Sequence, residues 1–252
     1  MDSKQKLKNF EFELLKIEDE KLRQFASKII VDAGDWFFVD PASTSGNYHP
    51  KFANEEGGLV KHTKAVFYFL NSMFRSNMFD VDGRQEDLLR VGAIAHDIRK
   101  HTEGNVYVEN HAEEAAKYIM EMADKNPDLI SHDDAEYIAK AVAAHMGIWG
   151  DPEPKTDAER ILHLADYIAS RRPNDIDFVK LDEELQKPEQ RDQKVNDPKD
   201  YIFTFGKHTG KTIGEISKRD MPYLVWVNEQ TDFKQKRAKK FVKYFLEEQK
   251  KH

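Results

Sequence analysis

Apolar side chains recur every three or four residues over most of the first 175 positions, and this spacing predicts helices. Phe25 and Ile29, for example, share one face of a predicted N-terminal helix. Ser131 is a good helix cap, and the segment from Thr156 to Glu159 has the pattern of a capping box. The predicted helices cover residues 1–30, 59–79, 86–100, 110–123, 131–145 and 156–172, with a polar loop over residues 41–58.

The pattern changes near residue 180. Asp, Glu, Lys, Gln and Pro dominate residues 179–200, which is typical of a linker. After it, the alternating aromatic segment 201–205 predicts a strand, residues 206–210 a turn and residues 211–213 a short return strand, with helices completing the chain. We therefore predict a mainly α protein with three parts: a helical bundle over residues 1–178 (core about 55–175), a polar linker over 179–200 and a small α+β module over 201–252.

Composition narrows the chemistry that this fold can carry. Of 252 residues, 39% are hydrophobic and 34% are charged, and no apolar run approaches the roughly 18 residues that span a bilayer. The start of the sequence lacks the apolar segment of a signal peptide, so we expect a cytoplasmic protein without a membrane partner. The absence of cysteine excludes disulfides, thiolate zinc sites and a cysteine nucleophile. The formal net charge of −7 disfavours nucleic-acid binding through overall charge, but a local basic patch is compatible with it.

Several histidines and aspartates stand beside small or apolar residues, where a polar side chain needs a reason. Burying imidazoles and carboxylates is costly unless they pair or bind a metal, and helical bundles build metal sites from side chains that converge on the core. Mn, Fe, Co, Ni or Zn suits such ligands, and Mg suits the oxygen-rich end of the set. Four His and two Asp exceed what one catalytic ion usually needs, whereas two ions that share an Asp would use them all. The set comprises His62, His96, Asp97, His111, His145 and Asp166.

The order of these residues resembles that of the HD-domain phosphohydrolases. His62, His96-Asp97 and Asp166 follow the H…HD…D pattern of that family, and two further histidines, His111 and His145, match its subset that holds two metals. The resemblance covers about residues 55–175 and implies an HD-domain helical bundle in which Asp97 bridges two divalent ions. It further implies that His62, His96 and Asp166 complete the protein shell of one ion, and His111 and His145 that of the other.

The same resemblance implies a reaction and the residues that assist it. A metal-activated water would hydrolyse a phosphate ester or anhydride bond, with Asp97 and Lys100 as the catalytic residues. The segment from His96 to Lys100 is similar to the family's usual His-Asp-Ile-Gly-Lys, with Arg99 in place of glycine, so Arg99 is a candidate for substrate choice. Lys100 is four residues after His96, and we expect both on one helix face, with the lysine reaching a phosphate oxygen.

Other substrate-binding candidates have a plain structural alternative. Arg171 and Arg172 would grip a second phosphate or merely complement a helix C-terminus. His49 would touch substrate or merely initiate a turn, Lys100 can equally be a surface lysine, and His111 can be an ordinary first-turn residue. His163, three residues before Asp166, fits either a partner of the ligands or a surface position.

Two motifs are rejected. His132-Asp133 follows a helix cap and precedes Asp134, as in the acidic first turn of a helix. The segment Gly206–Thr212 has three residues between its glycines where a phosphate-binding P-loop needs four.

The sequence thus predicts a hydrolase acting on a nucleotide, a cyclic nucleotide or a nucleic-acid end. The alternative is a nucleotide-sensing or nucleic-acid-binding protein on a non-catalytic HD scaffold. The C-terminal module resembles that of exodeoxyribonuclease X-type exonucleases, which implies contact with nucleic acid or a protein partner; the basic run from Lys234 to Lys240 is either part of that contact or a solvated face. The loop over residues 41–58 is similar to loops of small bacteriophage HD proteins. Neither the exact substrate nor the oligomeric state follows from the sequence.

Overall fold

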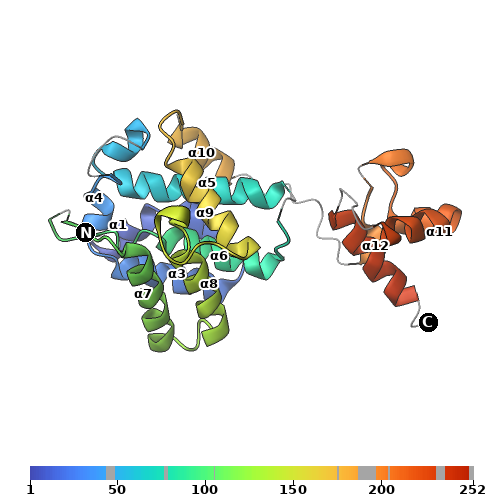
Figure 1. Cartoon of the computed structure of the whole chain (residues 1–252), viewed down its shortest axis with the longest axis horizontal. Coiled ribbons are helices and arrows are strands. Elements are labelled where there is room, and N and C mark those ends of the chain that lie inside the picture. The colour runs from blue at the N-terminus through green and yellow to red at the C-terminus, as the bar shows by residue number, and fades with distance from the viewer. Residues whose placement is uncertain are drawn as a thin grey trace. The chain divides into compact units, whose positions relative to one another are not determined.

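The structure is a computed structural model, and it describes residues 1–43, 49–76, 79–104, 106–174, 176–186, 197–203, 205–230 and 236–249. The chain divides into two compact units, Met1–Pro188 and Glu189–His252. Each unit has a hydrophobic core of its own. As predicted, the described residues are mainly helical (Figure 1).

The N-terminal unit is a bundle of helices joined by short turns (Figure 1). Its α-helices are α1 (Ser3–Lys8), α2 (Glu11–Lys16), α3 (Glu20–Asp32), α4 (Trp36–Val39), α5 (Gly58–Arg75), α6 (Gly83–Ala95), α7 (His111–Lys125), α8 (His132–Ala143), α9 (Asp157–Ala169) and α10 (Phe178–Gln186). Two 3₁₀ turns, η1 (Lys51–Asn54) and η2 (Gly147–Trp149), and a small antiparallel hairpin of β1 (His101–Thr102) and β2 (Val106–Tyr107) complete it. Two predicted caps form, because the Ser131 side chain accepts from the backbone of Asp134 and Thr156 forms a capping box with Glu159. Asn110, whose residue type also predicts an N-cap, precedes α7 without a side-chain cap hydrogen bond.

Three sequence-based expectations need correction in this unit. The N-terminal 30 residues form three helices, because the chain leaves helical geometry at Ile17 and the Asp19 side chain caps a new helix. Helix α6 ends at Ala95, so His96 to Lys100 form a turn and not the end of a helix. The first residues of the predicted linker form α10, whose Leu181 and Leu185 are buried in the core; residues 187–196 of that linker lie outside the described part of the chain.

Helix α5 is central to the position of the site. It packs against α4, α6 and α9 and buries ten of its residues. A side chain at Gly58 would place its Cβ 2.3 Å from the carbonyl oxygen of Ala53, so only glycine lets η1 lie this close to the start of the helix. His62 follows one turn later on the buried side of the helix.

A buried arginine joins α5 to α6. Arg90 is 1% exposed; its Nη1 donates to Asp87 Oδ1 over 2.8 Å and its Nε to Asn71 Oδ1 over 2.9 Å. The other carboxylate oxygen of Asp87 accepts from the backbone amide of Asp19 at the start of α3. Because a buried charge is stable only when it is paired and hydrogen-bonded, this network fixes the packing of the two helices that carry His62 and His96.

The C-terminal unit is built from η3 (Pro198–Asp200), η4 (Gly206–His208), α11 (Ile213–Glu229) and α12 (Lys236–Gln249). The two predicted strand segments do lie antiparallel, but they meet at a single β-bridge, Ile202 with Thr212. Pairing stops there because Thr212 already caps α11, which begins at the next residue. Among the described residues, no helix combines the length and the apolar character that a membrane crossing requires.

A buried carboxyl group in α2 generates the first prediction. Burial raises the pKa of Glu13 from 4.5 to about 7, although Lys64 lies 3.4 Å away. The folded protein therefore holds a proton that the unfolded chain releases between these two pH values, and this contribution to stability is lost as the pH rises through 7. We expect the unfolding free energy of the wild type to fall by about 3 kcal/mol over that pH interval and that of Glu13→Gln to lack this fall. Urea denaturation from pH 4.5 to 8 measures both.

Glu11→Gln is the matched control, since Glu11 is exposed on the same helix. It should leave the pH dependence of the wild-type protein in place. Parallel stability curves for Glu13→Gln and the wild type would contradict the assignment.

Candidate metal centre

Five segments of the N-terminal unit bring His62, His96, Asp97, His111, His145 and Asp166 together. Their positions relative to the helices explain why. His62 is in the second turn of α5, and His96 and Asp97 follow the last residue of α6. His111 opens α7, His145 follows the C-cap of α8, and Asp166 projects from α9. The four histidines and Asp97 are at most 1% exposed.

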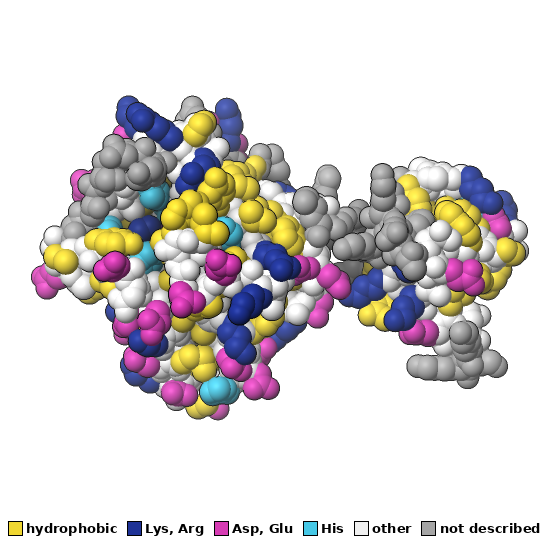
Figure 2. Space-filling view, in the orientation of Figure 1, with side chains coloured by type: hydrophobic (Ala, Val, Ile, Leu, Met, Phe, Trp, Pro, Cys, Tyr) yellow, Lys and Arg dark blue, Asp and Glu magenta, His cyan; other side chains and the backbone are white. Residues whose placement is uncertain are grey.

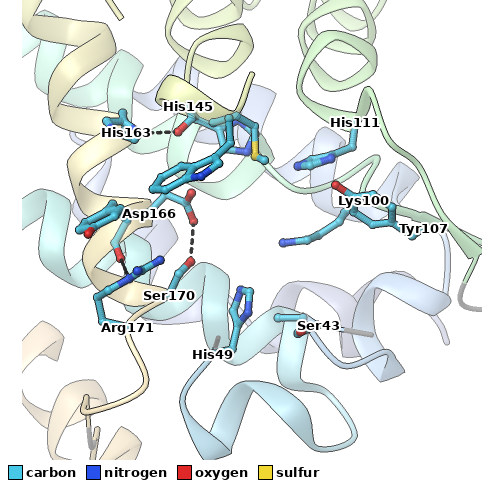
Figure 3. A pocket seen from close by; sticks show the side chains of 14 residues that line it. Ser43, His49, Lys100, Tyr107, His111, His145, His163, Asp166, Ser170 and Arg171 are labelled. Atoms are coloured by element: carbon cyan, nitrogen blue, oxygen red, sulfur yellow. Dashed lines mark hydrogen bonds between the residues drawn. The ribbon is translucent and has the colours of Figure 1, made fainter. Parts of the chain in front are cut away.

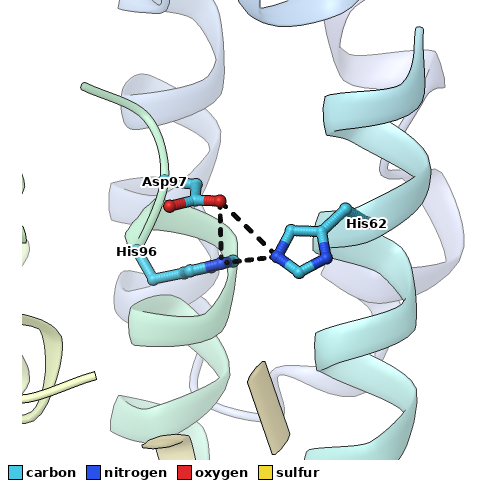
Figure 4. Close-up of side chains that lie close together, drawn as sticks. All are labelled: His62, His96 and Asp97. Carbon is cyan, nitrogen blue, oxygen red and sulfur yellow. Dashed lines mark hydrogen bonds and ion pairs between the residues drawn. The ribbon is translucent and has the colours of Figure 1, made fainter. Parts of the chain in front are cut away.

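One group of ligand atoms surrounds Oδ2 of Asp97 (Figure 4). His62 Nε2 lies 3.5 Å and His96 Nε2 lies 3.4 Å from this oxygen, and the two nitrogens are 3.3 Å apart. Asp166 closes the group from α9, with its Oδ1 3.0 Å from His62 Nε2 and 3.9 Å from His96 Nε2. Donors of this type at this spacing can enclose a divalent ion.

A second group surrounds the other oxygen of the same carboxylate. Oδ1 of Asp97 lies 3.3 Å from His111 Nε2 and 3.6 Å from His145 Nε2. The two groups therefore share Asp97, with one oxygen turned to each. This arrangement indicates a metal site.

Local hydrogen bonds aim three of the rings. The Nδ1 of His96, His111 and His145 donates to the backbone carbonyl three residues earlier, over 2.8, 3.1 and 2.7 Å. With a proton held on Nδ1, the Nε2 atom of each ring faces the centre, and this is the nitrogen that a metal would bind.

Buried atoms without partners show that the site fits a metal. Asp97 Oδ1 and His111 Nε2 are both buried and make no hydrogen bond within the described part of the chain. Such atoms are costly in a protein interior unless something else satisfies them, and a divalent cation would satisfy both. The nitrogen and oxygen donors and these unsatisfied atoms therefore both fit a bound divalent cation.

The electrostatics of the centre also favour cation binding. Burial would raise the pKa of Asp97, but the positive charges of Lys100 and His96 outweigh it and hold this pKa well below its usual range. Burial lowers the pKa of His62 and of His145, which keeps both rings uncharged and able to donate a lone pair. Burial would also lower the pKa of His96, but the carboxylates of Asp97 and Asp166 raise it. Asp97 thus remains negative and attracts positive charge.

Lys100 lies beside the shared carboxylate. Its ammonium donates to Asp97 Oδ2 over 2.6 Å from the turn that follows α6. Burial would lower the pKa of Lys100, but the carboxylates of Asp97 and Asp166 outweigh it and the pKa is raised. Lys100 is therefore charged. It reaches the site from a turn, so the prediction that it shares a helix face with His96 is wrong.

A pocket of about 200 Å³ opens onto the centre (Figure 3). Lys100 and His111 project into it from one side, and Asp166, Ser170 and Arg171 border the opposite side. His49 also lines it, 5.3 Å from the His62 ring between ring centroids, and burial lowers the pKa of His49 to about 3. The pocket is therefore lined both by candidate metal ligands and by cationic and neutral polar side chains.

Not every predicted substrate-binding residue reaches this pocket. Lys100, Arg171 and His49 line it, whereas Arg99 and Arg172 do not. The Arg99 guanidinium lies 3.9 Å from the centroid of the Tyr118 ring, and Arg172 is exposed. Residues 44–48 of the predicted polar loop over residues 41–58 lie outside the described residues. The rejected His132 and Asp133 are exposed in the first turn of α8.

Sequence reasoning missed part of the pocket wall and left His163 undecided. The missed residues are Ala42, Ser43, Tyr107, Met146, Trp149, Tyr167 and Ser170. His163 lines the pocket, and its Nδ1 donates to the backbone carbonyl of His145 over 2.7 Å. The spacing of Tyr167 and Ser170, one and four residues after Asp166, was the available signal, since both flank a proposed ligand on one helix.

Comparison with protein-family models gives two matches. The HD domain model matches residues 59–171, and the exodeoxyribonuclease X-like C-terminal model matches residues 203–232. No curated protein and no solved structure matches the chain. The fold and the site define a helical protein with a buried, metal-type His/Asp centre. Residues 59–171 thus form an HD domain, a type of domain that is typically a metal-dependent phosphohydrolase, and residues 203–232 an exodeoxyribonuclease X-like C-terminal region.

The shared carboxylate generates the second prediction. Asp97→Ala removes the one side chain common to both groups of ligands, so we expect it to abolish tight binding of divalent metal. Equilibrium dialysis against Mn, Fe, Co, Ni and Zn, followed by elemental analysis, measures the bound metal.

His132→Ala is the control, since it removes an exposed histidine of the unused His-Asp pair. We expect it to bind metal as the wild type does. If Asp97→Ala retained the full metal content of the wild type, the centre would not be where these residues meet.

Proposed function

We propose that this protein is a metal-dependent phosphohydrolase or phosphodiesterase. Its substrate would be a nucleotide, a cyclic nucleotide or a nucleic-acid end, cleaved at a phosphate ester or anhydride bond. The observation that carries the proposal is that the two oxygens of buried Asp97 face two separate groups of ligands. A carboxylate shared in this way is what a pair of ions requires of its bridge.

We assign two divalent ions to the site. His62, His96, Asp97 and Asp166 would hold one ion, and Asp97, His111 and His145 the other. Mn, Fe, Co, Ni, Zn or Mg is compatible with these nitrogen and oxygen donors. When bound, such ions acidify a water and neutralise charge that develops on phosphate oxygens.

The side chains around the centre would hold the substrate. Lys100 is the cation nearest the shared carboxylate, and its charged ammonium can pair with a phosphate oxygen. Arg171 borders the opposite side of the pocket and makes no ion pair among the described residues, so its guanidinium is available to a second phosphate. His49 is neutral, and neither of its ring nitrogens has a hydrogen-bond partner in the described part, so it can donate to a substrate oxygen.

A hydrolysis screen tests the proposal. The metal-loaded protein should hydrolyse at least one member of a panel of nucleoside mono-, di- and triphosphates, cyclic nucleotides and short oligonucleotides, followed by phosphate release and chromatography. Asp97→Ala should reduce the rate to that of the protein-free reaction. His145→Ala should lower the bound metal from two ions to one per chain and the kcat by roughly 100-fold, because one charge-stabilising ion is lost.

His132→Ala should again match the wild type in rate and metal content. Unchanged hydrolysis by Asp97→Ala would refute the mechanism. Tight nucleotide binding without turnover under any of these metals would instead favour a nucleotide sensor.

Charge distribution supports a nucleic acid as the second candidate substrate. Residues 189–252 carry 15 Lys and Arg against 10 Asp and Glu, a formal charge of +5, whereas residues 1–188 carry 24 against 36, a formal charge of −12. Lys and Arg side chains are visible on the face of the C-terminal unit in Figure 2. A basic segment in an acidic chain is a typical electrostatic footprint of nucleic-acid binding, and the exodeoxyribonuclease X-like match covers the same unit.

Truncation after residue 188 separates the two candidates. The N-terminal unit has its own core and all six proposed ligands, so we expect the truncated protein to keep metal binding and hydrolysis of small nucleotides. If the substrate is a nucleic-acid end, the truncated protein should lose salt-dependent binding of single-stranded DNA or RNA and its cleavage, measured by fluorescence anisotropy and gel assays. Equal action of both proteins on oligonucleotides would exclude a role of the C-terminal unit in substrate capture.

A further inference from the structure

An aromatic surface forms one wall of the pocket. Trp149, the last residue of η2, stacks on Tyr167 of α9 with ring centroids 5.8 Å apart and planes within 8°. Arg171 lies over the same tyrosine, 4.1 Å from the ring centroid, and its Nε donates to the Tyr167 carbonyl. All three residues line the pocket that leads to the ligands.

The backbone holds this wall in a defined position. Gly147 has φ = 61°, and a Cβ there would lie 2.2 Å from the His163 ring, so glycine is required both by the conformation and by the contact. His163 in turn donates to the carbonyl of His145, a proposed ligand. The position of Trp149 therefore depends on the turn at Gly147, which packs against a side chain that is hydrogen-bonded to His145.

Packing of the fold does not account for Trp149. Tyr167 contacts the indole, yet 60% of the Trp149 surface is exposed, and the neighbouring Ile148 is 76% exposed. Trp149 also lines the pocket, so a ligand bound there would cover part of its exposed surface. The ring system that suits an indole face best is flat and aromatic, because stacked rings bury area on both sides.

We propose that Trp149 is a stacking platform for the base of a nucleotide whose phosphate lies at the metal centre. This inference rests on the proposed phosphohydrolase function and names the side chain that would hold the base of its substrate. Lys100 and three of the proposed metal ligands line the same pocket and would take the phosphate, and Arg171 beside the aromatic pair offers a contact to a further phosphate. A ligand that carries both a phosphate and a flat ring matches these groups.

Binding of non-hydrolysable probes tests the platform independently of turnover. The probes are nucleoside 5′-phosphonates with each of the four RNA bases, and ribose 5-phosphonate as the baseless analogue. Isothermal titration of the full-length, Mn²⁺-loaded protein gives each Kd. Stacking of a base on an aromatic side chain predicts that Trp149→Ala weakens binding of the nucleoside phosphonates roughly 5- to 150-fold and leaves ribose 5-phosphonate unchanged.

Two further variants make the comparison specific. Trp149→Phe keeps an aromatic face and should recover most of the lost affinity. Ile148→Ala removes the more exposed neighbour, which does not line the pocket, and should bind every probe as the wild type does. Melting temperatures check that each variant is folded, which the exposure of both side chains favours.

Three results would overturn the stacking role of Trp149. The first is an equal loss of affinity for base-bearing and baseless probes in Trp149→Ala, and the second is that no nucleoside phosphonate binds to the wild type. The third is that phosphotyrosine binds with the same affinity as the nucleoside phosphonates and depends equally on Trp149. If Trp149→Ala hydrolysed nucleotides and ribose 5-phosphate with the same ratio of KM values as the wild type, the stacking role of Trp149 would be wrong and the phosphohydrolase function would stand. Base-dependent binding without hydrolysis would keep the platform and discard the reaction.

Discussion

The negative charge of Asp97 lies almost wholly inside the N-terminal unit, and the interior must compensate for it. Four imidazoles, one ammonium and two backbone turns are arranged around this carboxylate. The helices cannot shift freely without exposing or isolating the charge, because an unpaired buried carboxylate costs several kcal/mol. The charge of Asp97 therefore constrains the packing of α5, α6 and α9 as well as the chemistry of the centre. The buried Arg90 network, which joins α6 to α5, adds to this constraint.

Most of the six proposed ligands could be found from the sequence because they are polar residues in an apolar context. Ala93 to Ala95 before His96 and Ala143 to Ala144 before His145 leave no polar surface for these rings to join. The helices could likewise be predicted from apolar periodicity and from capping residues. At Ser131 and Thr156, for example, one side chain determines where the helix begins. Local signals of this kind need no knowledge of the tertiary structure.

What the sequence could not supply depends on tertiary contact. Arg99 lies between Asp97 and Lys100 in the sequence, yet it stacks on Tyr118 and does not line the pocket, because residues 96–100 form a turn in which helical spacing does not describe the side-chain directions. Trp149 gave no motif, since its importance arises only from a glycine turn that places it on Tyr167. The pairing of residues 201–203 with 211–213 was readable as alternation, but its length was limited by a helix cap that uses the same threonine.

The carbonyls that hold the Nδ1 protons of His96, His111 and His145 have a consequence for how metal enters. Ala93 and Val142 lie in the last turns of α6 and α8, where carbonyl groups lack the amide partner that a continuing helix would provide, and Val108 lies just before α7. Closing a loop of three residues costs little chain entropy, so each ring is oriented by its own segment. An arriving cation meets lone pairs that already point inward, and little rotation of side chains has to accompany its capture. Discrimination among ions then falls to the spacing between helix ends, which the bundle as a whole determines.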